Sequence, residues 1–112
     1  MSFTDALPIE GYGPGFFRIG GQVYENAILV TPTAVEEWGG YDNVSLLLDK
    51  ADEIDVLFIG TGAEIAHIPA ALRDALEAAE IGVETMASPS ACRTYNVLLS
   101  EGRRVAAALL CV

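Results

Sequence analysis

Hydrophobic residues in the first third of the chain follow the pattern of β-strands. The runs FFRI (16–19) and QVYENAILV (22–30) are rich in aromatic and β-branched residues, and the Gly20-Gly21 pair between them is a common hairpin turn. The pair Thr31-Pro32 ends the second run, because proline cannot continue a central strand ladder. We therefore predict an N-terminal β-hairpin of two strands.

Two segments flank this hairpin. The preceding segment, GYGPG (11–15), is rich in glycine, but no helix follows it, so we interpret it as a turn rather than a phosphate-binding loop. The following segment, TAVEEWGG (33–40), predicts a short turn or helix, with Trp38 packed against the core.

A different pattern begins at DVLFIGTG (55–62), where four consecutive apolar residues are typical of a strand covered on both faces. HIPAALRDALEAAE (67–80) repeats apolar residues at helical spacing, with Pro69 in its first turn, and VETM (83–86) predicts the next strand. A strand, a helix and a strand within about 30 residues form a βαβ unit, so these two strands should be parallel and joined by a right-handed crossover.

The last third of the chain adds one more helix and strand. Ser88 is a suitable N-cap, Pro89 a suitable first helical residue and Gly102 a suitable stop, which predicts a helix over 89–101. The apolar residues 104–111 then predict a final strand. Together these elements predict one α/β domain over residues 1–112, with a central mixed β-sheet, an N-terminal β-hairpin and helices packed on the sheet.

Composition narrows the possible functions. At 112 residues and 52% hydrophobic content, the chain can form a single core. Its formal net charge of −10 disfavours binding to nucleic acid, because phosphates require a basic face. Residues 93–104 are the exception, with three arginines against one glutamate. Arg103 and Arg104 either complement a helix C-terminus or form a small basic site suited to an anion or an acidic partner.

Our expectations about the cellular compartment and about metal binding rest mainly on sequence patterns that the chain lacks. No apolar run approaches the ~18 residues that span a bilayer, and the N-terminus does not resemble a signal peptide, so we expect a cytoplasmic protein without a transmembrane segment. Cys92 and Cys111 fit no zinc spacing and are expected as free thiols. The single histidine, His67, is expected in a loop or at a helix start. We therefore expect no metal and no cofactor.

The first candidate for ligand binding is the GTG triplet (60–62). It follows a buried strand, at the end of the strand where α/β proteins commonly bind ligands. A dinucleotide-binding fingerprint would need a third glycine where this chain has Ile65. The alternative interpretation is structural, with Gly60 and Gly62 allowing a tight exit from the strand.

The second candidate is ACRTYN (91–96), near the start of the last predicted helix. A helix N-terminus and Arg93 would both lower the pKa of the Cys92 thiol, as in reactive cysteines, although helical spacing also allows Cys92 to be a small buried residue. We expect Cys92 and Tyr95 to turn inward, and Arg93 and Asn96 to face the surface. The candidate pocket combines both stretches: Gly60, Thr61, Gly62, Cys92, Arg93, Thr94 and Asn96.

Four stretches resemble a known family, the Mth938-like domain or DUF498: IGTG (59–62), LRDAL (72–76), IGVETM (81–86) and ACRTYNVLLSEGRRVAAALL (91–110). The resemblance runs from about Ile9 to Leu110. It implies a three-layer fold around a central mixed sheet, in a cytoplasmic bacterial protein without an established reaction. The family includes a mitochondrial assembly factor for respiratory complex I. No catalytic role is implied for the motif residues, which are Cys92, Thr94, Asn96, Glu101, Gly102 and Arg103.

Two functions remain open. The first is a non-enzymatic interaction or assembly protein, whose partners would be proteins such as subunits of a membrane complex. The resemblance and the lack of a complete catalytic constellation favour it. The second is a domain that binds a small anion, or an enzyme that uses the Cys92 thiol, with its site near Gly60–Gly62 and Cys92-Arg93.

Overall fold

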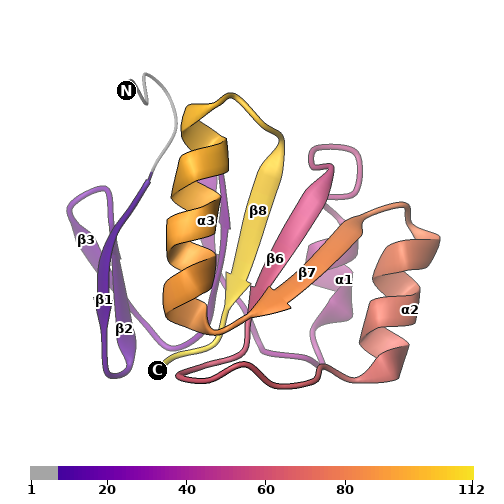
Figure 1. Ribbon diagram of the computed structural model, residues 1–112, viewed down its shortest axis with the longest axis horizontal. Helices are drawn as coiled ribbons and strands as arrows, with labels where there is room; N and C mark the ends of the chain where they lie inside the picture. The colour runs from indigo at the N-terminus through magenta and orange to yellow at the C-terminus, as the bar shows by residue number, and fades with distance from the viewer. Residues whose placement is uncertain (1–7) are drawn as a thin grey trace.

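The computed structural model describes residues 8–112. The first elements in this range form a small antiparallel sheet. Its strands are β1 (Ile9–Gly13), β2 (Phe16–Ile19) and β3 (Gln22–Glu25), in that order across the sheet (Figure 1). The predicted turn at Gly20-Gly21 is confirmed, and both glycines have positive φ, a conformation that glycine adopts without steric cost. The turn interpretation of residues 11–15 was wrong in part, because residues 11–13 belong to β1 and only Pro14 and Gly15 turn the chain.

The second predicted strand, 22–30, is two strands in two different sheets. It breaks at Asn26, whose φ of +72° bends the chain between β3 and β4 (Ile28–Thr31). The prediction of a turn or helix over 33–40 was also wrong. Residues Ala34–Glu37 form β5, which pairs with β4 through a tight turn after Thr31. At the first place, the pairing of β4 with the distant β8 outweighs the local pattern; at the second, β5 forms a hairpin with the neighbouring β4.

The larger sheet contains five strands in the order β5-β4-β8-β6-β7. Strand β6 (Val56–Gly60) runs parallel to β7 (Gly82–Met86) and to β8 (Val105–Leu109), while β4 runs antiparallel to its neighbours. The predicted mixed sheet and the predicted parallel pair of the βαβ unit are therefore confirmed. All five residues of the central strand β8 are buried, as expected for a strand covered on both faces.

Helices and the small sheet cover the two faces of the larger sheet. Helices α1 (Val44–Leu48) and α2 (Ala70–Ala78) pack on one face, and α3 (Ser88–Ser100) packs on the other (Figure 1). The three-stranded sheet lies beside α3, on the side away from β7 (Figure 1), and Phe17 and Ile19 from β2 join the same core as α3. Helix α2 begins at Ala70, later than predicted, and α1 was not predicted.

Candidate functional site

Ser88, at the start of α3, joins three segments of the chain. Its side chain is fully buried. The Ser88 hydroxyl donates a hydrogen bond to the Leu110 carbonyl at 2.6 Å and accepts one from the Gly62 amide at 3.0 Å. The prediction of Ser88 as N-cap was wrong, because it is the first residue of the helix and Ala87 precedes it in the N-cap position. The hydroxyl holds the loop after β6 and the tail after β8 against the helix instead.

This junction explains the two glycines of the GTG triplet. A Cβ on Gly60 would lie 2.7 Å from the Ser88 Oγ and 2.9 Å from the Ser88 Cα, distances that real Cβ atoms essentially never show. Gly62 has a φ of +104°, which other residues rarely adopt. Between them, the Thr61 hydroxyl donates to the Glu64 carbonyl at 2.8 Å and accepts from the Ala66 amide at 3.0 Å. The loop's polar groups therefore serve its own structure.

Some of the backbone hydrogen-bond donors at the N-terminus of α3 are already engaged or missing. The Ser88 amide donates to the Gly62 carbonyl at 2.8 Å, and Pro89 has no amide hydrogen to offer. Two of the donors that would bind an anion at a helix start are therefore unavailable.

Cys92 lies in the core, as helical spacing predicted. Its side chain is 4% exposed, and it packs in the cluster of buried residues between α3 and the sheets. Burial raises the pKa of the Cys92 thiol to about 11, and the nearby charge of Arg93 offsets this only in part. Because the thiolate is the nucleophilic form, the thiol is in its unreactive state near neutral pH.

Asn96 clamps the first strand to α3. Its side-chain oxygen accepts a hydrogen bond from the Ile9 amide, and its side-chain nitrogen donates to the Ile9 carbonyl, both at 2.8 Å. The carboxamide therefore pairs with β1 as a neighbouring strand would. Asn96 was predicted to face the surface, but it is half-buried in this contact. No local pattern indicates this role, because its partner lies 87 residues away.

The seven predicted pocket residues differ in burial and in hydrogen-bond partners. Gly60, Thr61 and Gly62 form the loop that meets Ser88, and the side chain of Cys92 is buried. Arg93 is exposed, as predicted, and its guanidinium donates to the Ser90 hydroxyl at 3.2 Å. Thr94 is half-buried. A separate surface depression of about 230 Å³ is lined by other residues: Ile65, Ala66, His67 and Thr85.

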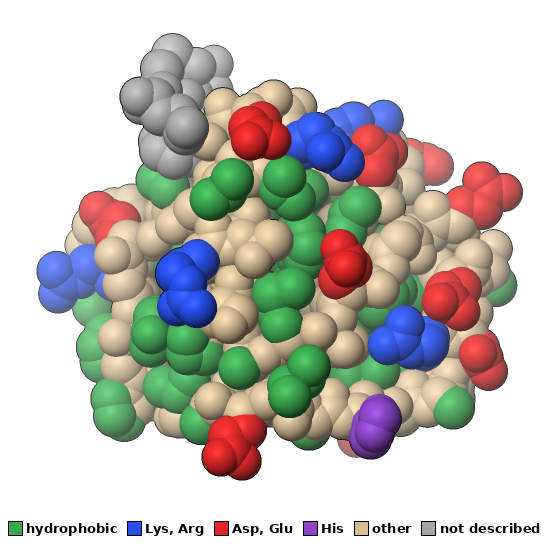
Figure 2. All heavy atoms as spheres, in the orientation of Figure 1, with side chains coloured by type: hydrophobic (Ala, Val, Ile, Leu, Met, Phe, Trp, Pro, Cys, Tyr) green, Lys and Arg blue, Asp and Glu red, His purple; other side chains and the backbone are tan. Residues whose placement is uncertain are grey.

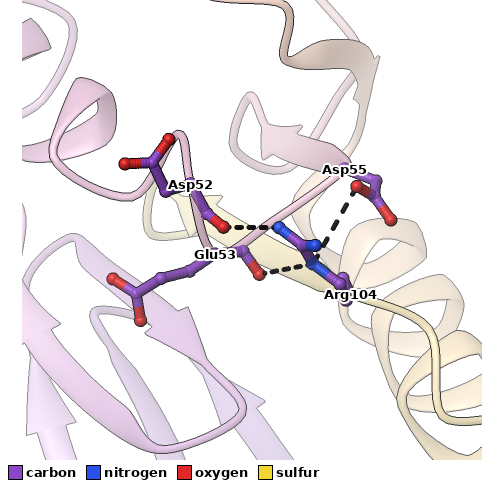
Figure 3. A network of polar contacts seen from close by, with 4 residues as sticks. All are labelled: Asp52, Glu53, Asp55 and Arg104. Carbon is purple, nitrogen blue, oxygen red and sulfur yellow. Dashed lines mark hydrogen bonds and ion pairs between the residues drawn. The ribbon is translucent and has the colours of Figure 1, made fainter.

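Arg104 has a structural role that the sequence did not indicate. Its guanidinium donates to the carbonyls of Asp52 and Glu53, at 2.6 and 3.1 Å, and lies 3.9 Å from the Asp55 carboxylate (Figure 3). Arg104 therefore ties the segment before β6 to the start of β8. Arg103 and Arg104 were expected either to complement the end of α3 or to form a small basic site. The last turn of α3 carries no basic residue, and the guanidinium of Arg104 binds the segment before β6 instead.

Within residues 8–112, no three or more His, Cys, Asp or Glu residues are grouped as a metal ion would require. No helix in the same range is long and apolar enough to cross a membrane. His67 is exposed in the loop before α2, as predicted.

The chain belongs to the family described as "Protein of unknown function (DUF498/DUF598)", whose model matches residues 9–110. An uncharacterized protein of Rhodobacter capsulatus is 52% identical over 96% of this chain and 87% of its own length. The NADH dehydrogenase [ubiquinone] 1 alpha subcomplex assembly factor 3 of Danio rerio is 34% identical over 91% of this chain. The chain spans 63% of the length of that assembly factor.

Solved structures share the fold. A protein of Bartonella henselae described as an outer membrane protein has a TM-score of 0.86 and 36% identity, covering 97% of this chain and 98% of its own. A Bordetella pertussis protein described as a Mth938-like domain has a TM-score of 0.79 and 28% identity, covering 96% of this chain and 87% of its own. The resemblance seen in the sequence is therefore confirmed, as is the α/β fold that it implied.

Proposed function

We propose that this chain is a cytoplasmic protein-binding module that takes part in the assembly of a larger complex, of the respiratory-complex type. The observation that carries the proposal is the similarity to assembly factors, because it extends over 91% of the chain rather than one motif. An assembly factor acts by holding a partner, so it needs a stable fold and an exposed surface but no reactive group. Its partners would be protein subunits, including subunits of a membrane complex.

The surroundings of Cys92 support a non-catalytic role. A thiol nucleophile needs access to substrate and a lowered pKa, whereas this thiol is buried and its pKa is raised to about 11. The motif that identifies the family also contains residues with structural tasks, since Asn96 holds β1. Cys92 and Asn96 therefore have structural positions within this motif.

The alternative, a small-anion site or thiol chemistry near Gly60–Gly62 and Cys92-Arg93, has less support. Backbone donors at the start of α3 are partly occupied, and Arg93 is the one charged side chain on that helix. Anion binding there would rest on a single exposed guanidinium, which contributes little in water.

Deletion of the gene from its own cells tests the proposal. We expect less assembled NADH dehydrogenase (ubiquinone) on native gels, and we expect a plasmid copy to restore it. A Cys92→Ala copy should restore assembly as well as the wild type does. Normal assembly in the deletion strain would contradict the proposal, and failure of the folded Cys92→Ala copy would favour the thiol alternative.

A further inference from the structure

Strand β7 is an open edge of the larger sheet. It pairs with β6 on one side and is the last strand in the order of the sheet (Figure 1). In a parallel pair, every second residue directs both of its backbone groups to the same neighbouring strand. The Gly82 amide donates to the carbonyl of Asp55, just before β6, at 3.0 Å. Val83 and Thr85 have the opposite alternation, so their amides and carbonyls point away from β6.

These outward backbone groups are available to another chain. Within residues 8–112, no hydrogen bond joins the amides and carbonyls of Val83 and Thr85 to another segment. An edge with unpaired N–H and C=O groups is a template for an added strand, and proteins commonly protect it with proline, lysine or a bulge. Strand β7 has none of these, since its register with β6 is unbroken and Glu84 is its one charged residue. The opposite edge, β5, has two glutamates among its four residues.

The surface depression described above lies beside this edge. Thr85 from β7 lines it together with three residues of the loop before α2, namely Ile65, Ala66 and His67. Thr85 pairs with Ile59, which belongs to the core under α2, so Thr85 is on the α2 side of the sheet. A residue of an added strand that lies next to Thr85 on this side can place its side chain in the depression. The volume of about 230 Å³ and the aliphatic side chain of Ile65, which is 67% exposed, suit a large apolar side chain.

The other side of the same edge carries an unpaired negative charge. Glu84 pairs with Phe58 of the core under α3, and it is exposed and has no ion pair within residues 8–112. Between residues 70 and 86, four carboxylates stand against one arginine. In Figure 2, acidic side chains prevail over the right-hand part of the molecule, where Figure 1 places β7 and α2. A lysine or arginine is therefore the complementary residue beside Glu84 on an added strand.

A second copy of the chain does not supply that complement. Two β7 strands related by a two-fold axis would be antiparallel, and bonding Val83 of each copy to Thr85 of the other would place the two Glu84 residues directly opposite. Like charges in that position destabilise a strand pair. Each copy would also bring a net charge of −10. The charges therefore favour a different protein as the occupant.

We propose that the open edge of β7 binds an extended segment of a different protein, which joins the larger sheet as an added strand. Its backbone bonds to the outward groups of Val83 and Thr85. A lysine or arginine lies beside Glu84 on the α3 side, and a large apolar side chain lies beside Thr85 in the depression. Because successive residues of a strand face opposite sides, the segment contains these two residues next to each other. This inference rests on the proposed protein-binding function and names the surface that performs it.

Hydrogen exchange in the free protein tests whether the edge is open. The amides of Val83 and Thr85 should exchange at least about tenfold faster than those of Glu84 and Met86, which face β6. Equal protection of all four amides would show that the edge is already covered. That result would overturn the inference and leave the proposed function standing.

Photo-crosslinking in the cells of origin tests the occupant. Benzoylphenylalanine replaces Ile65 beside the depression in one variant and Val23 on the three-stranded sheet in a control, because both side chains are exposed. We expect position 65 to cross-link to one protein, through a segment with adjacent basic and apolar residues, and position 23 to give no such product. A product from position 23 alone, or from position 65 to a second copy, would overturn the inference but keep the proposed function. No specific product from either position would count against both.

A synthetic peptide with the sequence of the cross-linked segment then tests the pairing. We expect it to slow exchange of the Val83 and Thr85 amides, and we expect Glu84→Lys to weaken its binding about tenfold. Glu37→Lys, on the exposed glutamate that ends β5, changes the net charge equally and should have less than about a twofold effect. Replacing the peptide's basic residue by glutamate should restore binding to Glu84→Lys. Equal effects of the two variants, unchanged exchange or no restoration would overturn the inference.

Discussion

Replacing Ser88 by alanine removes one hydroxyl from the junction between the β6 loop, the C-terminal tail and α3. Two hydrogen bonds are lost, one to the Leu110 carbonyl at 2.6 Å and one from the Gly62 amide at 3.0 Å. Each contributes about 1 kcal/mol net, and a buried donor left unpaired adds about 1–3 kcal/mol. Water cannot easily replace the hydroxyl, because Ser88 is fully buried. We therefore expect the free energy of unfolding to fall by roughly 2–4 kcal/mol.

Urea denaturation followed by circular dichroism measures this change. The midpoint should shift to lower urea while the slope stays constant, because the surface exposed on unfolding hardly changes. Ser90→Ala is the matched control: Ser90 lies on the same helix, and its hydroxyl serves only the exposed Arg93 in the described contacts. It should cost less than about 0.5 kcal/mol. If the two variants lose equal stability, or if Ser88→Ala loses less than about 1 kcal/mol, the Ser88 junction does not stabilise the fold as argued.

Four other substitutions test further buried groups and contacts of the fold. Gly60→Ala places a Cβ 2.9 Å from a backbone atom and should lower the free energy of unfolding by at least about 2 kcal/mol in urea; an unchanged midpoint would refute the clash. Tyr95→Phe removes a buried hydroxyl that has no partner within residues 8–112, so it should stabilise by about 1 kcal/mol, and a loss would show that the hydroxyl is satisfied. Asn96→Ala should cost about 2 kcal/mol and speed hydrogen exchange of the Ile9 amide; unchanged exchange would disprove the clamp. Because burial raises the pKa of Cys92 from 9.0 to about 11, the unfolded chain loses this proton first. The contribution of this pKa difference to the free energy of unfolding is fully present below pH 9 and is lost between pH 9 and 11. Wild type should therefore lose more stability over that range than Cys92→Ala does. Equal losses in the two proteins would contradict the raised pKa.

The family motif is explained largely by packing. Within the stretch from Ala91 to Asn96, the side chains of Ala91, Cys92 and Tyr95 are buried, and they pack in the cluster that contains residues of both sheets. In the same stretch, the Asn96 carboxamide makes two long-range hydrogen bonds, both to the Ile9 backbone. Residues that pack in the core or hold strands can therefore mark a family, since folding constrains sequence as much as chemistry does.

The amino-acid pattern alone determined the parts of the fold that depend on near neighbours. The periodic apolar residues before Gly82 and the buried run 56–59 predicted the βαβ unit and its parallel strands, and helical spacing predicted that Cys92 is buried. These features follow from chain geometry over a few turns, which sequence spacing records directly.

Only the tertiary structure decided where distant segments meet. The split at Asn26, the Ser88 junction and the Asn96 clamp each depend on a partner far along the chain, up to 87 residues away for Asn96. The hydroxyl of Ser88 could equally have capped a helix, because the same donor and acceptor atoms serve either role. Which role it takes is settled by burial against Gly62 and Leu110, and spacing along the sequence does not contain that information.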